Sequence, residues 1–110
     1  MNDTTPTVAD RPDRERYEIA VGDQVAFLTY RRREDHLTLV HTEVPESLRE
    51  QGLGGKLARH ALNAARRAGQ KVVVKCPFVT TWLRRHREYD DIVVARVAED
   101  ADVQPPREPR

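Results

Sequence analysis

Three glycines within four residues, Gly52-Leu53-Gly54-Gly55, stand directly before the strongest helical pattern of the chain. Glycine lets a backbone turn tightly and lets a ligand approach without interference from a β-carbon. A helix that begins here would point unpaired N–H groups and its positive dipole end outward, an arrangement that binds phosphate and other anions. Arg49 and Lys56, on either side of the glycines, could add charged hydrogen bonds. Segment 49–55 therefore predicts an anion-binding loop.

Two common phosphate loops do not fit this segment. A P-loop needs Gly-x-x-x-x-Gly-Lys-Ser/Thr, but Glu50 stands in place of the first glycine and Leu57 follows Lys56. The dinucleotide pattern Gly-x-Gly-x-x-Gly also fails at Leu57. What remains is Arg-x-x-Gly-x-Gly between a predicted strand and a predicted helix. The alternative is a glycine cluster that merely begins a helix.

The pattern around the glycines predicts a strand-helix-strand unit. From Leu53 to Ala68, a turn of ~100° per residue gathers the apolar residues on one half of the helical wheel, and Gly69 supplies a left-handed cap. Strands are predicted on both sides, over 36–44 and 71–75. The short return from helix to strand favours parallel pairing with a right-handed crossover. Pro45 ends or splays the first of these strands.

The remaining elements complete a small mixed domain. We expect a hairpin from strands 17–21 and 24–32 around Gly22-Asp23. A second helix runs from Pro77 to about Arg87, and a last strand covers 92–97. Simple alternation along strand 36–44 would place Leu37, Leu39, His41 and Glu43 on one face.

Four sequence words in order resemble a compact, single-domain member of the GNAT superfamily of N-acetyltransferases: His41–Pro45, Arg49-x-x-Gly-x-Gly, Cys76–Val79 and His86-x-Glu88-Tyr89. The likeness covers roughly residues 15 to 93. Arg87 departs from it, because relatives usually have proline there. The resemblance implies an α+β fold: a mostly antiparallel sheet of about five strands, one parallel strand-helix-strand unit and a cofactor cleft where strands splay.

The resemblance also implies a ligand and the residues that hold it. Acetyl-CoA or another acyl-CoA would bind in the splay, and the acyl group would pass to an unidentified amine. A main-chain N–H near Thr42 to Val44 would steady the reacting carbonyl. The residues expected to hold the cofactor are Val44, Arg49, Gln51, Gly52, Leu53, Gly54, Gly55 and Lys56.

Two residues of the strand before the loop are candidate bases. Glu43 stands at the strand end nearest the expected cleft, where it could act through water. His41 competes because an imidazole exchanges protons near neutral pH. The alternatives are an exposed glutamate at a strand end and a polar histidine beneath a helix.

Cys76 is a third candidate for the chemistry. It ends a predicted buried strand and precedes Pro77, at the expected N-cap of the second helix, where a helix dipole favours a thiolate. Three interpretations stay open: a buried structural cysteine, an acid or nucleophile near the CoA sulfur, and a redox-sensitive gate. A nucleophile would give an acyl-cysteine and ping-pong kinetics.

Composition limits the remaining possibilities. The chain has 110 residues, 34% of them charged, and a formal net charge of +1, so no strong field points to a charged partner. We expect one domain over 15–97, flanked by disordered segments 1–14 and 98–110. No apolar run suits a membrane span or a secretory signal, and the single cysteine excludes an intrachain disulfide. These features favour a cytoplasmic protein. We expect no metal site.

Two other functions are compatible with this sequence. The small core leaves little room for an acceptor pocket, which would suit a non-catalytic CoA-binding or regulatory module. A nucleic-acid-binding protein would rest only on scattered arginines, and the absence of interleaved aromatic residues on the strands counts against it. The oligomeric state is not predicted.

Overall fold

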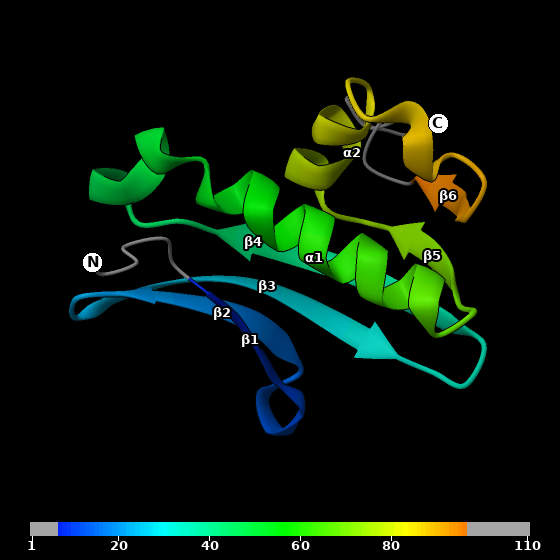
Figure 1. Ribbon diagram of the computed structural model, residues 1–110, viewed down its shortest axis with the longest axis horizontal. Helices are drawn as coiled ribbons and strands as arrows, with labels where there is room; N and C mark the ends of the chain where they lie inside the picture. The colour runs from blue at the N-terminus through cyan, green and yellow to red at the C-terminus, as the bar shows by residue number, and fades with distance from the viewer. Residues whose placement is uncertain (1–6, 97–110) are drawn as a thin grey trace, which may run out of the picture.

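The computed structural model describes residues 7–96, which form a six-stranded sheet with two α-helices (Figure 1). The predicted α+β fold class is confirmed, with six strands in place of about five. The strands are β1 (Val8–Arg11), β2 (Arg16–Val21), β3 (Gln24–Arg32), β4 (His36–Glu43), β5 (Lys71–Val74) and β6 (Val93–Arg96). The helices are α1 (Leu53–Arg67) and α2 (Pro77–Leu83), and 3-10 turns cover Pro12–Arg14, Glu46–Gln51 and Arg87–Tyr89.

The order of the strands in the sheet is their order in the chain, from β1 to β6. Strands β1 to β4 pair antiparallel, and Gly22 takes a φ of +62° in the predicted hairpin turn between β2 and β3. The parallel β4-α1-β5 unit is present as predicted. A second parallel pair, β5 with β6, was not predicted.

Helix α1 lies across one face of the sheet and buries its apolar side there (Figure 1). Gly69 follows the helix with a φ of +72°, the left-handed conformation predicted for the end of this helix. The core lies between α1 and the strands. Its fully buried aliphatic residues include Ile19, Leu28, Leu39, Leu57, Leu62, Val72 and Val74.

A bulge in β4 reverses which side chains face the core. Tyr30 pairs with Leu39, but its neighbour Thr29 pairs with His41, so Val40 is an extra residue in β4. Before the bulge, Leu39 is buried under α1; after it, Thr42 lies opposite the buried Leu28. The predicted shared face of Leu37, Leu39, His41 and Glu43 is therefore wrong: the last two point away from the helices.

The N-terminal segment is more ordered than predicted. Val8–Arg11 forms the edge strand β1 and pairs with β2. Asp10 accepts hydrogen bonds from the Tyr30 hydroxyl and from Arg32 on β3. The prediction of disorder over 1–14 is thus wrong for Val8 to Arg14, since strand pairing and these side-chain contacts hold the segment. Residues 1–6 and the predicted tail 98–110 lie outside the described residues.

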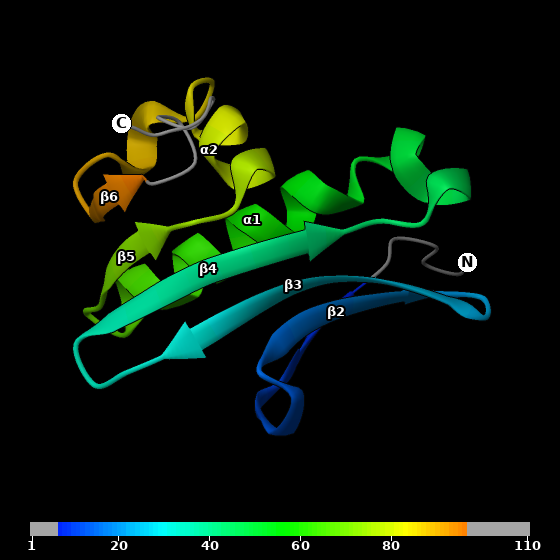
Figure 2. The same cartoon turned by 180° about the vertical axis from the view of Figure 1, so that it is seen from behind.

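The second helix is shorter than predicted. It ends at Leu83, and a 3-10 turn over Arg87–Tyr89 leads to β6. Both helices lie on the same side, because Phe78 and Trp82 of α2 pack against glycines of α1. Figure 2 views the sheet from the other side, where no described helix crosses in front of β2, β3 and β4.

Candidate active site

A cleft opens where β4 and β5 part. The two strands pair only as far as Leu39 and Val74, and a last hydrogen bond joins the Lys75 N–H to the Leu39 carbonyl at 2.8 Å. Beyond it, β4 continues to Glu43 while the other strand turns into α2. The cleft has a volume of about 680 Å³. Its lining residues are His41, Thr42, Glu43, Val44, Pro45, Glu46, Arg49, Gly52, Gly54, Gly55 and Phe78.

The start of α1 borders this cleft. Gly52 caps the helix with a φ of +71°, a conformation that an L side chain rarely adopts. The Lys56 N–H donates to the Gly52 carbonyl at 3.2 Å. The preceding N–H groups, of Leu53, Gly54 and Gly55, therefore belong to the first turn, which has no intrahelical acceptors. Two of these three residues line the cleft, so the loop and the opening adjoin.

The other two glycines have a packing role that the sequence did not reveal. A β-carbon on Gly54 would lie 2.7 Å from Cζ of Phe78, and one on Gly55 would lie 2.9 Å from Nε1 of Trp82. The glycines thus let α2 pack closely against the first turn of α1. Phe78 also lines the cleft and is 43% exposed. The sequence offered one indication that Phe78 belongs to the site: it lies in the Cys76–Val79 motif, directly after the strand that parts from β4.

Of the remaining residues predicted to hold the cofactor, some line the cleft and others do not. Arg49 lines the cleft and donates from Nε to the Val44 carbonyl at 3.2 Å, which joins the 3-10 turn to the end of β4. Gln51 and Lys56 are exposed but do not line the cleft. Leu53 is buried, so it can offer only its main chain. Glu46, which was not predicted, adds a carboxylate to the lining.

His41 and Glu43 come together on the uncovered side of the sheet. Nε2 of His41 lies 3.2 Å from Oε1 of Glu43, and the two side chains are 57% and 61% exposed. His41 is therefore not a core residue beneath a helix, the alternative considered from the sequence. The two candidate bases form one hydrogen-bonded pair at the mouth of the cleft.

Cys76 lies on the other side of the split. It is 1% exposed, and its Sγ is 3.1 Å from Oγ1 of Thr42, across the gap between the separating strands. It is the N-cap of α2, as predicted, but it does not line the cleft. The sequence pointed to the main chain near Thr42 but not to its side chain, because no residue type marks the bulge that turns this side chain toward Cys76.

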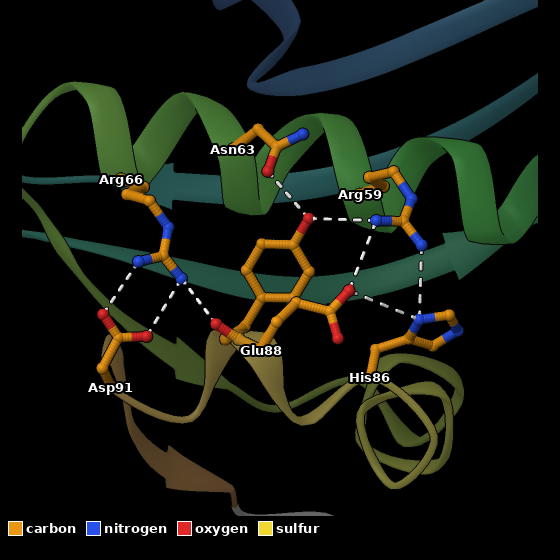
Figure 3. Close-up of polar contacts among 7 residues, drawn as sticks. Arg59, Asn63, Arg66, His86, Glu88 and Asp91 are labelled. Carbon is orange, nitrogen blue, oxygen red and sulfur yellow. Dashed lines mark hydrogen bonds and ion pairs between the residues drawn. The ribbon is translucent and has the colours of Figure 1, made fainter.

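The residues of the His86-x-Glu88-Tyr89 motif connect the segment after α2 to α1 (Figure 3). The Tyr89 hydroxyl donates to Oδ1 of Asn63 at 2.7 Å, and Arg59 reaches the Glu88 carboxylate at 3.4 Å. Arg66 binds both carboxylate oxygens of Asp91, at 2.8 and 2.9 Å. That hydrogen bonding holds the pKa of Asp91 below its ordinary value.

This cluster is structural, since none of its residues lines the cleft. Tyr89 is 3% exposed and Trp82 stacks on His86 with ring centroids 3.7 Å apart. Arg87, where relatives usually have proline, begins the 3-10 turn and donates to Asp90 at 2.6 Å. The local geometry therefore accommodates the departure.

Comparison with known proteins agrees with this architecture. The family model described as GCN5-related N-acetyl-transferase matches residues 16–92, and the chain belongs to that family. The NMR solution structure of a GCN5-like protein from Staphylococcus aureus shares the fold, with a TM-score of 0.65 at 24% sequence identity. That match covers 81% of this chain and 88% of the other. No curated protein sequence matches the chain significantly.

Between residues 7 and 96, no group of three or more histidine, cysteine, aspartate or glutamate side chains is arranged to hold a metal ion. None of the helices in that range is long and apolar enough to cross a membrane.

Proposed function

We propose that this protein transfers an acyl group, acetyl in the first instance, from coenzyme A to an amine. The observation that carries the proposal is the cleft at the β4–β5 split, which brings the first turn of α1 and the His41–Glu43 pair to one opening. The family membership supports the reaction class. Donor and acceptor are our inference.

The residues around the cleft suit a diphosphate. The first-turn N–H groups of α1 are preferred partners for an anion, and Gly54 and Gly55 of that turn both line the cleft. Arg49 contributes a guanidinium at the same opening, and Lys56 stands one residue further along α1. The acyl-CoA thioester would supply a carbonyl carbon open to attack by an amine and a thiolate leaving group.

The His41–Glu43 pair would prepare the amine. An alkyl amine arrives as an ammonium ion and must lose a proton before its nitrogen can attack. In the tautomer that protonates Nε2 of His41, this nitrogen donates to Glu43, and Nδ1 is left to accept the proton directly or through water. Main-chain N–H groups between Thr42 and Val44 are the proposed donors to the developing oxyanion.

Binding and turnover are tested separately. Titration calorimetry with acetyl-CoA should give saturable binding that Arg49→Ala weakens, whereas Arg33→Ala, at the far end of the sheet, leaves it unchanged. Release of free CoA in the presence of amines reports turnover. Glu43→Gln should lower turnover ~10²-fold without changing the Kd for CoA, and Glu34→Gln serves as the matched control. Absence of CoA binding would refute the proposal.

A non-catalytic CoA-binding or regulatory module is the second candidate, favoured by the openness of the acceptor side. Saturable CoA binding with no turnover on any amine, peptide amines included, would select it. The cytoplasmic location expected from the sequence remains a prediction.

A further inference from the structure

The cleft reaches both faces of the sheet. Thr42 and Phe78 line it on the side of the helices, where Thr42 contacts the buried Cys76. His41 and Glu43 line it on the uncovered side, because the bulge at Val40 has reversed their direction. If the cofactor lies beside α1, the acceptor must arrive from the uncovered side, where the candidate bases are.

We define the open face as the side chains of Phe27, Thr29, Arg31, His41 and Glu43. Phe27 pairs with Glu43 and Thr29 with His41 across β3 and β4, so all five project from the same side. The Phe27 and His41 rings lie 6.4 Å apart between centroids. No described helix covers this face (Figure 2).

The shape of the open face suits an extended acceptor. Pockets for small molecules typically enclose about 70–90% of the ligand surface, but here the His41 and Glu43 side chains are themselves 57% and 61% exposed. A small amine would meet few contacts beyond its reacting nitrogen. A polypeptide lying along the strands would also contact Thr29 and the Arg16 guanidinium, which lies over the Phe27 ring at 4.3 Å, and would gain affinity residue by residue.

The cationic side chains on this side of the sheet limit the class of acceptor further. No hydrogen bond or ion pair joins the Arg31 guanidinium to another described residue. Lys71 is exposed on the same side of the sheet, since it alternates with the buried Val72 and Val74. Arg31 is two strand residues, about 7 Å, from Thr29, the partner of His41, and four, about 13 Å, from Phe27, the partner of Glu43. A polyamine would be repelled by these cations, whereas carboxylates would be attracted to them.

We propose that the acceptor is an amine carried by a polypeptide, an N-terminus or a lysine, with acidic side chains two to four residues away. The amine would reach the His41–Glu43 pair while the acidic side chains lie over Arg31 and Lys71. This inference rests on the proposed acyltransferase function and specifies its substrate class.

The first experiment compares acceptors at equal amine concentration by the release of CoA from acetyl-CoA. The panel contains spermidine, a dipeptide amide and two decapeptides. Each decapeptide has one reactive amine, and the positions two and four residues from it are glutamates in one peptide and glutamines in the other. The acidic decapeptide should exceed the dipeptide in kcat/KM by about tenfold, the equivalent of two or three strand-type contacts. Spermidine should be the poorest acceptor.

A charge reversal isolates the open face. Arg31→Glu should raise the KM for the acidic decapeptide about fivefold, as expected for one exposed ion pair, with kcat and the Kd for CoA unchanged. Arg67→Glu, an equivalent reversal of an exposed arginine on α1, on the other side of the sheet, should have no effect.

The outcomes distinguish the two proposals. If spermidine or the dipeptide equals the acidic decapeptide, or if Arg31→Glu changes nothing, the polypeptide acceptor is refuted while the acyltransferase function stands. If no amine is acylated although CoA binds, both are refuted.

Discussion

The ring of Phe78 lies against Gly54 so closely that residue 54 has no room for a β-carbon without displacement of the ring. Phe78 is the second residue of α2 and also borders the cleft, so one contact links the packing of the two helices to the shape of the opening. The glycines of the loop therefore have separable roles: Gly52 for its positive φ, and Gly54 and Gly55 for packing and access.

The contact predicts the cost of a single methyl group. Gly54→Ala should gain helix propensity of up to about 1 kcal/mol but lose about 1–3 kcal/mol to overpacking, for a net loss of about 1 kcal/mol measured by urea unfolding. The displaced ring should also alter the Kd for CoA. In a double-mutant cycle, Gly54→Ala should no longer reduce the free energy of unfolding when Phe78 is already replaced by alanine. Additive effects of the two substitutions would contradict the assigned contact.

Cys76 is expected to be structural, because its side chain is buried and does not line the cleft. Cys76→Ala should lower the free energy of unfolding by on the order of 1–2 kcal/mol, as for loss of a small buried group. Turnover should stay within about threefold, below the ~10²-fold effect of losing a general acid or base. Iodoacetamide should label the native protein slowly, with or without CoA.

Mass spectrometry can show whether Cys76 is instead acylated during the reaction. An acylated Cys76 after incubation with acetyl-CoA, together with ping-pong kinetics, would make the thiol a nucleophile. Thr42→Val is the informative companion, because it removes the polar partner of Sγ and keeps the shape of the side chain.

Tyr89 is expected to act in stability alone. Tyr89→Phe removes the hydrogen bond to Asn63 and leaves Oδ1 of that residue with one partner fewer, at a cost of about 1 kcal/mol. Turnover and CoA affinity should not change, since the cluster in Figure 3 lies outside the cleft. Denaturant unfolding and the CoA-release assay, made on the same preparation, check both statements. A large loss of turnover at unchanged stability would give Tyr89 a role in the reaction.

Glu18 predicts a dependence of stability on acid pH. Hydrogen bonding from Arg16, at 2.5 Å, lowers the pKa of Glu18 below its ordinary value despite its burial on the sheet. A carboxyl with a depressed folded pKa stabilises the protein above its unfolded pKa, near 4.5, and this contribution is lost as pH falls through the lower folded value. Thermal melts from pH 6 to 3 should therefore show a falling Tm.

The substitution Glu18→Gln tests the source of that fall. It should reduce stability at pH 6 by about 1.5–3 kcal/mol, the range for a hydrogen bond to a charged group, and flatten the acid dependence. Glu34→Gln, in the turn between β3 and β4, serves as the control. Equal slopes in the two variants would assign the acid sensitivity to other carboxyls.

The sequence was sufficient for the elements that depend on local pattern. The period of the α1 side chains, the left-handed Gly69 and the strand-helix-strand order each have a local physical cause, and each is present. The edge strand β1 was missed because its stability comes from pairing with β2 and from contacts of Asp10 with Tyr30 and Arg32. No such partner is visible in a polar segment read alone.

The candidate site was predicted in part for a similar reason. The glycine loop and the end of β4 were located by motif, and both border the cleft. The bulge at Val40 shifts the register of β4, and no glycine or proline in the strand indicates it. His41, Thr42 and Glu43 were therefore assigned to the wrong faces of the sheet. Phe78 and Glu46 line the cleft through tertiary packing that no local spacing encodes.

The arrangement of strands in chain order has a consequence for how this molecule is made. Every described strand except the first pairs with the strand that precedes it in the chain, so none of them must insert between two that are already joined. Low separation between partners in sequence favours rapid folding. Pairing among β1 to β4, which carry the His41–Glu43 pair, needs no residue beyond Glu43. These strands can therefore pair while the rest of the polypeptide is still emerging from the ribosome, and α1 and β5 then complete the cleft.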